Sequence, residues 1–198
     1  MPGKVFISYS REDADWLARV TGHLGVLEVE DRLKVWEDTR IQPGVDWFPE
    51  IQRAIAECDV AILLISMAFL NSSFIRQTEV PALLQRRASE GLCVIPVLVW
   101  PCTWRKVDWL ARIEMPLGST PLSRWRSKDK AEQAMADLAD LVDERLNAAA
   151  ARRPAAANVD LHNLPDGAAD FFGRGTDLEW LDAQWQTAGA VSVAVVGP

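Results

Sequence analysis

The sequence has few of the residues that build disulfide frameworks and zinc sites. It contains three cysteines, Cys58, Cys93 and Cys102, with no CxxC spacing, and two distant histidines, His23 and His162. An odd number of scattered cysteines argues against a disulfide framework, and the shortage of histidine argues against a zinc site. We therefore expect no metal centre.

The sequence also lacks a long apolar run and an excess of positive charge. No stretch reaches the ~18–20 apolar residues that span a bilayer, and the N-terminus shows no signal peptide. The net charge of −7 disfavours nucleic acid and anionic lipid, because both are bound by basic surfaces. These features predict a cytoplasmic globular protein with no nucleic-acid or membrane partner.

Strand-like and helix-like segments alternate along the first three quarters of the chain. Apolar runs predict strands at Lys4–Ser8, Leu33–Trp36, Asp59–Ser66 and Leu92–Val99. Apolar residues at helical spacing predict helices at Asp13–Leu27, Asp46–Cys58, Phe74–Glu90 and Lys128–Ala148. Asp13 would cap the first of these helices, and Pro81 would interrupt the third. This alternation predicts an α/β fold with a doubly wound parallel sheet, and the fully apolar Asp59–Ser66 would lie in its middle.

The segment from Trp100 to Trp125 follows no period and holds four of the nine tryptophans. It is either a packed surface loop or an interaction surface. Because tryptophan is mostly buried on average, we favour packing.

The character of the sequence changes after Asn147. An alanine-rich stretch, Ala148–Ala157, is typical of a linker. We therefore expect a first domain over residues 1–148, a linker over 149–169 and the start of another domain over 170–198.

Four segments of the first domain resemble the Toll/interleukin-1 receptor (TIR) family, in the family's order. They are Val5–Ser10 with Asp13, Trp36–Asp38 with Pro43-Gly44 and Trp47, Ala61–Ser66, and Phe69–Ile75 with Glu79. The resemblance implies a flavodoxin-like fold and self-association with other TIR domains as a homo-oligomer or filament. It also implies, for many bacterial members, hydrolysis of NAD⁺ to nicotinamide and ADP-ribose or a cyclic isomer in immune or cell-death signalling, with NAD⁺ as substrate and no cofactor.

In the family, Glu79 is the catalytic position. A glycosidase normally needs two carboxylates, one of which protonates the leaving group. The nicotinamide of NAD⁺ carries a positive charge and leaves as a neutral molecule, so one carboxylate that stabilises the oxocarbenium ion is enough. The alternative is that Glu79 has no catalytic role and is a solvated residue on the face of an amphipathic helix.

In many active members of the family an aromatic residue lies four positions before the glutamate, and this sequence lacks it. Ile75 occupies that position, and Phe74 lies five positions before Glu79. Either Phe74 covers the nicotinamide from a rotated position, or the pocket has lost this wall.

By the same resemblance, the loop Tyr9-Ser10-Arg11 would line the substrate pocket. An amphipathic ring at a strand end suits Tyr9 to a ligand site. Arg11 would bind the pyrophosphate or pair with the acids Glu12, Asp13 and Asp15, and the sequence does not favour either.

The resemblance to TIR domains also implies that the loop from Asp38 to Trp47 serves both assembly and substrate access. Gly44 allows a tight turn or a close backbone approach, although a plain surface turn is the alternative. Asp38 would orient the loop or touch the ribose, and Trp47 would pack under the loop or close the pocket.

The end of the chain resembles the opening of a STAND-class nucleotide-binding domain of the NACHT or NB-ARC type. The resemblance lies in Phe172-Gly173-Arg174 and in the apolar Val193–Val196 followed by Gly197-Pro198. The leading hypothesis is thus an NAD⁺-hydrolysing TIR domain within a TIR–STAND protein. The alternatives are a non-catalytic TIR scaffold and, less favoured, a flavodoxin-like receiver, which should show paired acids after the first strand.

Overall fold

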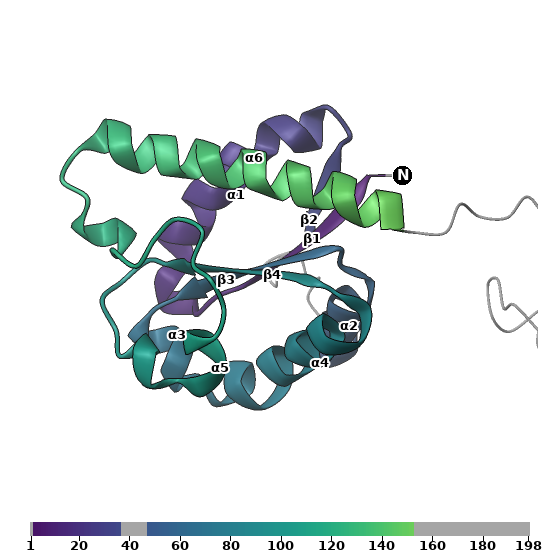
Figure 1. Cartoon of the computed structure of the whole chain (residues 1–198), viewed down its shortest axis with the longest axis horizontal. Helices are drawn as coiled ribbons and strands as arrows, with labels where there is room; N and C mark the ends of the chain where they lie inside the picture. Colours follow the sequence, from purple (N-terminus) through teal and green to yellow (C-terminus); the bar gives the residue numbers. More distant parts are fainter. Residues whose placement is uncertain (1, 37–46, 153–198) are drawn as a thin grey trace, which may run out of the picture. The chain divides into compact units, whose positions relative to one another are not determined.

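The computed structural model describes residues 2–36 and 47–152 and contains a four-stranded parallel sheet (Figure 1). The strands are β1 (Gly3–Ser8), β2 (Leu33–Trp36), β3 (Val60–Ile65) and β4 (Cys93–Leu98). Their order is β2-β1-β3-β4, and Val5 of β1 pairs with Val35 on one side and Val60 on the other. In this order β2 is added on one side of β1, and β3 and β4 are added on the other side. This is the strand order of flavodoxin-like folds.

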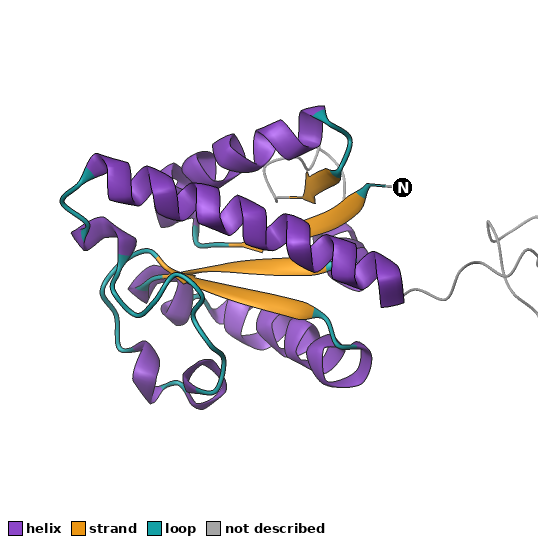
Figure 2. Ribbon diagram, turned by 45° about the horizontal axis from the view of Figure 1, so that its top comes forward, coloured by secondary structure: helices purple, strands orange, loops and turns teal. Residues whose placement is uncertain are grey.

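Helices cover both faces of the sheet, as Figure 2 shows. The α-helices are α1 (Ala14–Val29), α2 (Trp47–Glu57), α3 (Met67–Asn71), α4 (Val80–Glu90), α5 (Asp108–Ala111) and α6 (Lys128–Arg152). In Figure 1, α1 and α6 lie above the sheet and the other four lie below it. The predicted α/β fold with a doubly wound parallel sheet is confirmed.

The side chains of the strands divide between two cores. Val5 and Ile7 of β1 join the core under α1 and α6, whereas Phe6 between them joins the core over α2 and α4. Successive strand residues point to opposite faces, so a strand covered on both sides must be apolar at every position. All six residues of β3 are buried, and β3 lies between β1 and β4 as its sequence predicts.

The segment Phe74–Glu90, predicted as one helix, is a π-helical turn followed by an α-helix. A π-helical turn, η3 (Ile75–Glu79), precedes α4, and the N–H of Val80 donates to the carbonyl of Ile75. Pro81 stands in the first turn of α4. Proline lacks an N–H and its ring crowds the carbonyl four residues earlier, so the chain widens into a π turn just before it and continues as a helix after it.

Three further details depart from the sequence prediction. The short helix α3 was not expected, and α6 runs to Arg152, beyond the expected end at Ala148. The Trp100–Trp125 segment contains α5 and two 3-10 turns, η4 (Trp104–Lys106) and η5 (Leu122–Arg124). Trp104, Trp109 and Trp125 pack against the two cores, which agrees with the packing interpretation, while Trp100 is 47% exposed.

None of the helices in the described part of the chain is long and apolar enough to cross a membrane. The expected linker over 149–169 and second domain over 170–198 lie largely outside the described residues, and their boundaries stay predictions.

Two helix valines test how far the sheet depends on its cover. Val142 of α6 is fully buried against the sheet, whereas Val26 of α1 is 68% exposed. We expect Val142→Ala to lower the free energy of unfolding by about 2 kcal/mol, because two methyl groups are lost and a cavity remains. Urea denaturation measures the change.

Val26→Ala is the matched control, with an expected change within about 0.5 kcal/mol. Equal effects of the two substitutions would contradict the packing of α6 on the sheet.

Candidate functional site

Ser8 and Glu79 form a buried pair at the carboxyl end of β1. Ser8 is the last residue of β1 and is 1% exposed, and Glu79 is the last residue of η3 and is 7% exposed. The Oγ–H of Ser8 donates to Oε2 of Glu79. The burial of Glu79 rules out the solvated helix-face alternative.

A second serine–carboxylate pair lies at the same edge of the sheet. Ser66 follows β3, and its Oγ–H donates to Oδ2 of Asp13 over 2.5 Å. The same Oγ accepts the backbone N–H of Phe69 at 2.9 Å and so caps α3. One hydroxyl therefore connects the loop after β1 to the start of α3.

Asp13 is a buried carboxyl group rather than a helix cap. It occupies the cap position of α1, as predicted, but its side chain makes no capping hydrogen bond and is only 2% exposed. Burial raises the pKa of Asp13, and the charge of Glu12 adds to the rise, while the hydrogen bond from Ser66 lowers it. The side chain turns inward because Ser66 offers it a hydrogen-bond donor there.

The positions of the two pairs follow from the register of the sheet. Ser8 of β1 lies beside Leu63 of β3, three residues before Ser66. Parallel strands end at the same edge, where open α/β sheets bind their ligands. A carboxylate held in such a partly water-excluded place stabilises a nearby positive charge more strongly than one in water.

The π turn changes which residue accompanies Glu79. Ile75 is buried in the core over α2 and α4. In a π turn the hydrogen bond spans five residues, so a residue five positions before Glu79 comes about one turn away from it. That residue is Phe74, which is half-buried and meets Phe48 edge-to-face with ring centroids 6.3 Å apart.

The three predicted binding residues in the loop after β1 differ in their burial and contacts. Tyr9 is half-buried and packs against the core under α1 and α6, and the carbonyl of half-buried Ser10 accepts the N–H of Asp13. Arg11 is exposed and forms no ion pair with the acids Glu12, Asp13 and Asp15. Contact of these three residues with a substrate stays a prediction.

The remaining predicted site residues belong to the loop before α2. Asp38 and Gly44 lie outside the described residues, and Trp47 is described only as the first residue of α2. Their predicted roles are untested.

Sequence reasoning missed Ser8, Ser66 and Phe48 as parts of this site. A signal for the two serines was available, because each ends an apolar run and so stands at the carboxyl end of a covered strand. Phe48 had no such signal. Within residues 2–36 and 47–152, no three His, Cys, Asp or Glu side chains gather in a way that could hold a metal ion.

Asp13 provides a test by pH. The folded state holds the Asp13 proton more tightly than the unfolded chain, whose pKa is near 3.8. The stability from the protonated form is complete below that pH and is lost as the pH rises through the raised pKa. The Asp13→Asn variant has no group that titrates here, so its stability relative to wild type should increase as the pH is raised from about 3.8 through the raised pKa of Asp13.

Urea denaturation of both proteins across this range gives the difference directly. A difference that stays constant with pH would contradict the buried, hydrogen-bonded placement of Asp13.

Comparisons with known proteins agree with the resemblance seen in the sequence. The uncharacterized protein y4lF of Sinorhizobium fredii is 28% identical over 157 residues, which cover 77% of this chain and 49% of that protein. The chain thus spans about half the length of this relative.

Two solved structures are similar at low identity. The TIR domain of the Toll-related receptor TRR-2 from Hydra magnipapillata is 23% identical, with a TM-score of 0.44 and coverage of 56% of this chain and 80% of that one. The TIR domains of the activated Roq1 resistosome, which directly recognizes the pathogen effector XopQ, are 22% identical, with a TM-score of 0.42 and coverage of 70% and 84%. A family model described as TIR domain matches residues 5–139, more than half of the chain, and the chain therefore belongs to the TIR domain family.

Proposed function

We propose that this TIR domain hydrolyses NAD⁺, and that Glu79 stabilises the positive charge that develops on the ribose. The observation that carries the proposal is the buried Ser8–Glu79 pair at the carboxyl end of β1. Some TIR domains are NAD⁺ hydrolases and others are scaffolds, so family membership alone leaves both functions open.

The proposed reaction breaks the bond between the ribose C1′ and the nicotinamide nitrogen. The bonding electron pair leaves with nicotinamide, which becomes neutral, and the ribose is left as an oxocarbenium ion. Water then adds to C1′ and loses a proton, giving ADP-ribose, or an adenine nitrogen adds and gives a cyclic isomer. No general acid is needed, which matches a site centred on a single glutamate.

Ser8 has a positioning role in this proposal. Its hydroxyl holds one oxygen of the Glu79 carboxylate in place before the substrate arrives. A preoriented charge in a site with little water needs no rearrangement as the transition state forms, and such electrostatic stabilisation is typically a large part of catalysis.

Phe74 and Phe48 provide an aromatic wall near the glutamate. Their edge-to-face contact keeps the Phe74 ring in place one π turn before Glu79, and Phe48 is itself partly exposed. We propose that the Phe74 ring covers the nicotinamide, the role that Ile75, buried in the core, does not perform.

Self-association is the second part of the proposal. TIR domains typically self-associate, and we propose that the loop leading to α2 contacts a neighbouring subunit and completes the substrate pocket. The rate of nicotinamide release from NAD⁺ should then rise more steeply than linearly with protein concentration. A homo-oligomer or filament, a cytoplasmic location and a TIR–STAND architecture stay predictions.

The alternative function is a non-catalytic TIR scaffold. A scaffold requires complementary surfaces but not a buried carboxylate ordered by a serine at the ligand-binding edge of the sheet. The Ser8–Glu79 pair therefore favours the enzyme.

Glu79→Gln tests the catalytic role. It keeps the size of the side chain and removes the charge, so nicotinamide release from NAD⁺ should fall by roughly a hundredfold to a thousandfold. Chromatographic measurement of nicotinamide gives the rate, with wild type also fused to an oligomerising domain.

Glu144→Gln, at an exposed position on α6, is the matched control and should keep wild-type activity. No nicotinamide release from the clustered wild type would overturn the enzymatic function, and full activity of Glu79→Gln would overturn the residue assignment.

Phe74→Ala tests the aromatic wall. Loss of stacking on an aromatic ring costs about 1–3 kcal/mol per base, so kcat/KM for NAD⁺ should fall by about tenfold or more. Phe74→Tyr preserves the ring and should retain most of the activity. If both substitutions have the same effect, Phe74 contributes to packing rather than to substrate binding.

A further inference from the structure

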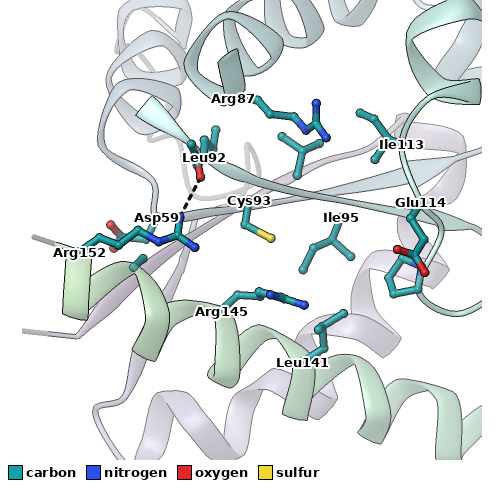
Figure 3. Close-up of a pocket in the computed structure, with 14 residues that line it drawn as sticks. Asp59, Arg87, Leu92, Cys93, Ile95, Ile113, Glu114, Leu141, Arg145 and Arg152 are labelled. Atoms are coloured by element: carbon teal, nitrogen blue, oxygen red, sulfur yellow. Dashed lines mark hydrogen bonds between the residues drawn. The ribbon is translucent and has the colours of Figure 1, made fainter. Parts of the chain in front are cut away.

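A groove runs along the outer edge of β4, at the amino-terminal end of the strand. Its volume is about 590 Å³, and it is lined by Arg87 of α4, by Arg145 and Arg152 of α6, by Cys93 of β4 and by Glu114 (Figure 3). In the described sheet β4 pairs only with β3, so its other edge faces this groove. An unpaired strand edge offers backbone N–H and carbonyl groups to a ligand.

Three guanidinium groups converge on the groove from opposite faces of the sheet. Arg145 and Arg152 are seven residues apart and so lie on one side of α6, while Arg87 comes from α4 on the other face. In Figure 3 the Cys93 thiol lies between Arg87 and Arg145. Burial raises the pKa of Cys93, and the charges of Arg145, Arg152 and Arg87 each act to lower it.

Unlike a structural arginine, none of these three arginines forms an ion pair with a residue that the structure describes. The neighbouring Arg86 shows the contrast: it pairs with Glu90 at 2.7 Å and donates to the carbonyl of Ile55 at 2.6 Å. Arg87 and Arg145 form no ion pair with any residue that the structure describes. Arg152 donates to the carbonyl of Gly91 over 3.4 Å, the dashed line in Figure 3.

Like charges gathered without partners repel one another, and a bound anion removes this repulsion. We propose that the groove is a binding site for a nucleotide with at least two phosphate groups, held by Arg87, Arg145 and Arg152. Arginine is well suited to phosphate because its planar fork donates two parallel hydrogen bonds. The chain as a whole has a net charge of −7, so a general basic surface does not explain anion binding. The three arginines would instead recognise the anion at this one place.

The acidic residues of the groove favour a nucleotide over a bare phosphate chain. Glu114 lies at the far side of the groove from Arg152 in Figure 3, and Asp59, whose Oδ2 already accepts the backbone N–H of Lys4 at 2.9 Å, is also part of the lining. Carboxylates repel phosphate but accept hydrogen bonds from ribose hydroxyls or a base amino group. A volume of about 590 Å³ falls within the usual range for small-molecule sites.

This groove is separate from the Ser8–Glu79 pair. Cys93 begins β4, whereas Ser8 ends β1, and the two strands run in parallel within one sheet. A strand of this length spans about 17–20 Å, so the two sites lie near opposite ends of the strands. The nucleotide site therefore does not rest on the proposed hydrolase function.

Calorimetric titration of the full chain with ADP, with pyrophosphate and with adenosine tests the proposal. ADP should bind the wild type more tightly than pyrophosphate does, and adenosine should not bind at millimolar concentration. The double substitution Arg87→Gln/Arg145→Gln should weaken ADP binding by roughly tenfold or more, because hydrogen bonds to charged groups are lost.

Arg53→Gln/Arg124→Gln, which makes the same charge change at two exposed arginines elsewhere, is the control and should leave ADP binding unchanged. Equal affinity in wild type and in the groove variant would overturn the proposal. So would ADP binding that persists in the groove variant and is lost in Glu79→Gln, because the ligand would then occupy the other site.

Cys93 gives a second readout that needs no groove variant. Cys93 and Cys102 are both half-buried free thiols, and only Cys93 lines the groove. ADP should slow alkylation of Cys93 by iodoacetamide and leave Cys102 unaffected, as followed by peptide mass spectrometry. Equal alkylation rates of Cys93 with and without saturating ADP would overturn the proposed site.

Discussion

The structure depends on burying both faces of one parallel sheet. β3 is apolar at every position because helices cover it from both sides, and this cover leaves only the strand ends for polar groups. Ser8 and Ser66 stand at the carboxyl ends of β1 and β3, still inside the layer of helices. A carboxylate that enters this region needs a hydrogen-bond donor, and each serine provides one. The two serine–carboxylate pairs follow from this requirement.

The two pairs have different consequences. Ser66 connects Asp13 to the first turn of α3, so this pair ties the loop after β1 to the neighbouring strand. Burial raises the pKa of Asp13 even though Ser66 donates a hydrogen bond to its carboxyl group. Glu79 lies on a π turn, and such turns are often found at functional sites. The Asp13 pair therefore suits a structural role, and the Ser8–Glu79 pair suits catalysis.

Local sequence patterns predicted most of the fold, since strands covered on both faces and amphipathic helices have clear periods. Leu33–Trp36 was predicted to the residue. Glu79 was identified through the family resemblance, and its burial could not have been read from the helical pattern. The remaining features depend on tertiary structure. The Asp13 side chain lies inside and accepts a hydrogen bond from Ser66. The π turn before Pro81 places Phe74 about one turn from Glu79. The arginines of the β4 groove are far apart in sequence, and only the packing of α4 and α6 around the sheet brings them together.

The central claim is that Glu79 acts directly on the nicotinamide ribose. A crystal structure of Glu79→Gln with unreacted NAD⁺ tests it most directly, because the variant should bind the substrate without cleaving it. We expect a ribose hydroxyl within about 3 Å of the residue 79 side chain and the nicotinamide ring against Phe74. NAD⁺ bound with its ribose away from residue 79, for example only in the β4 groove, would contradict the claim.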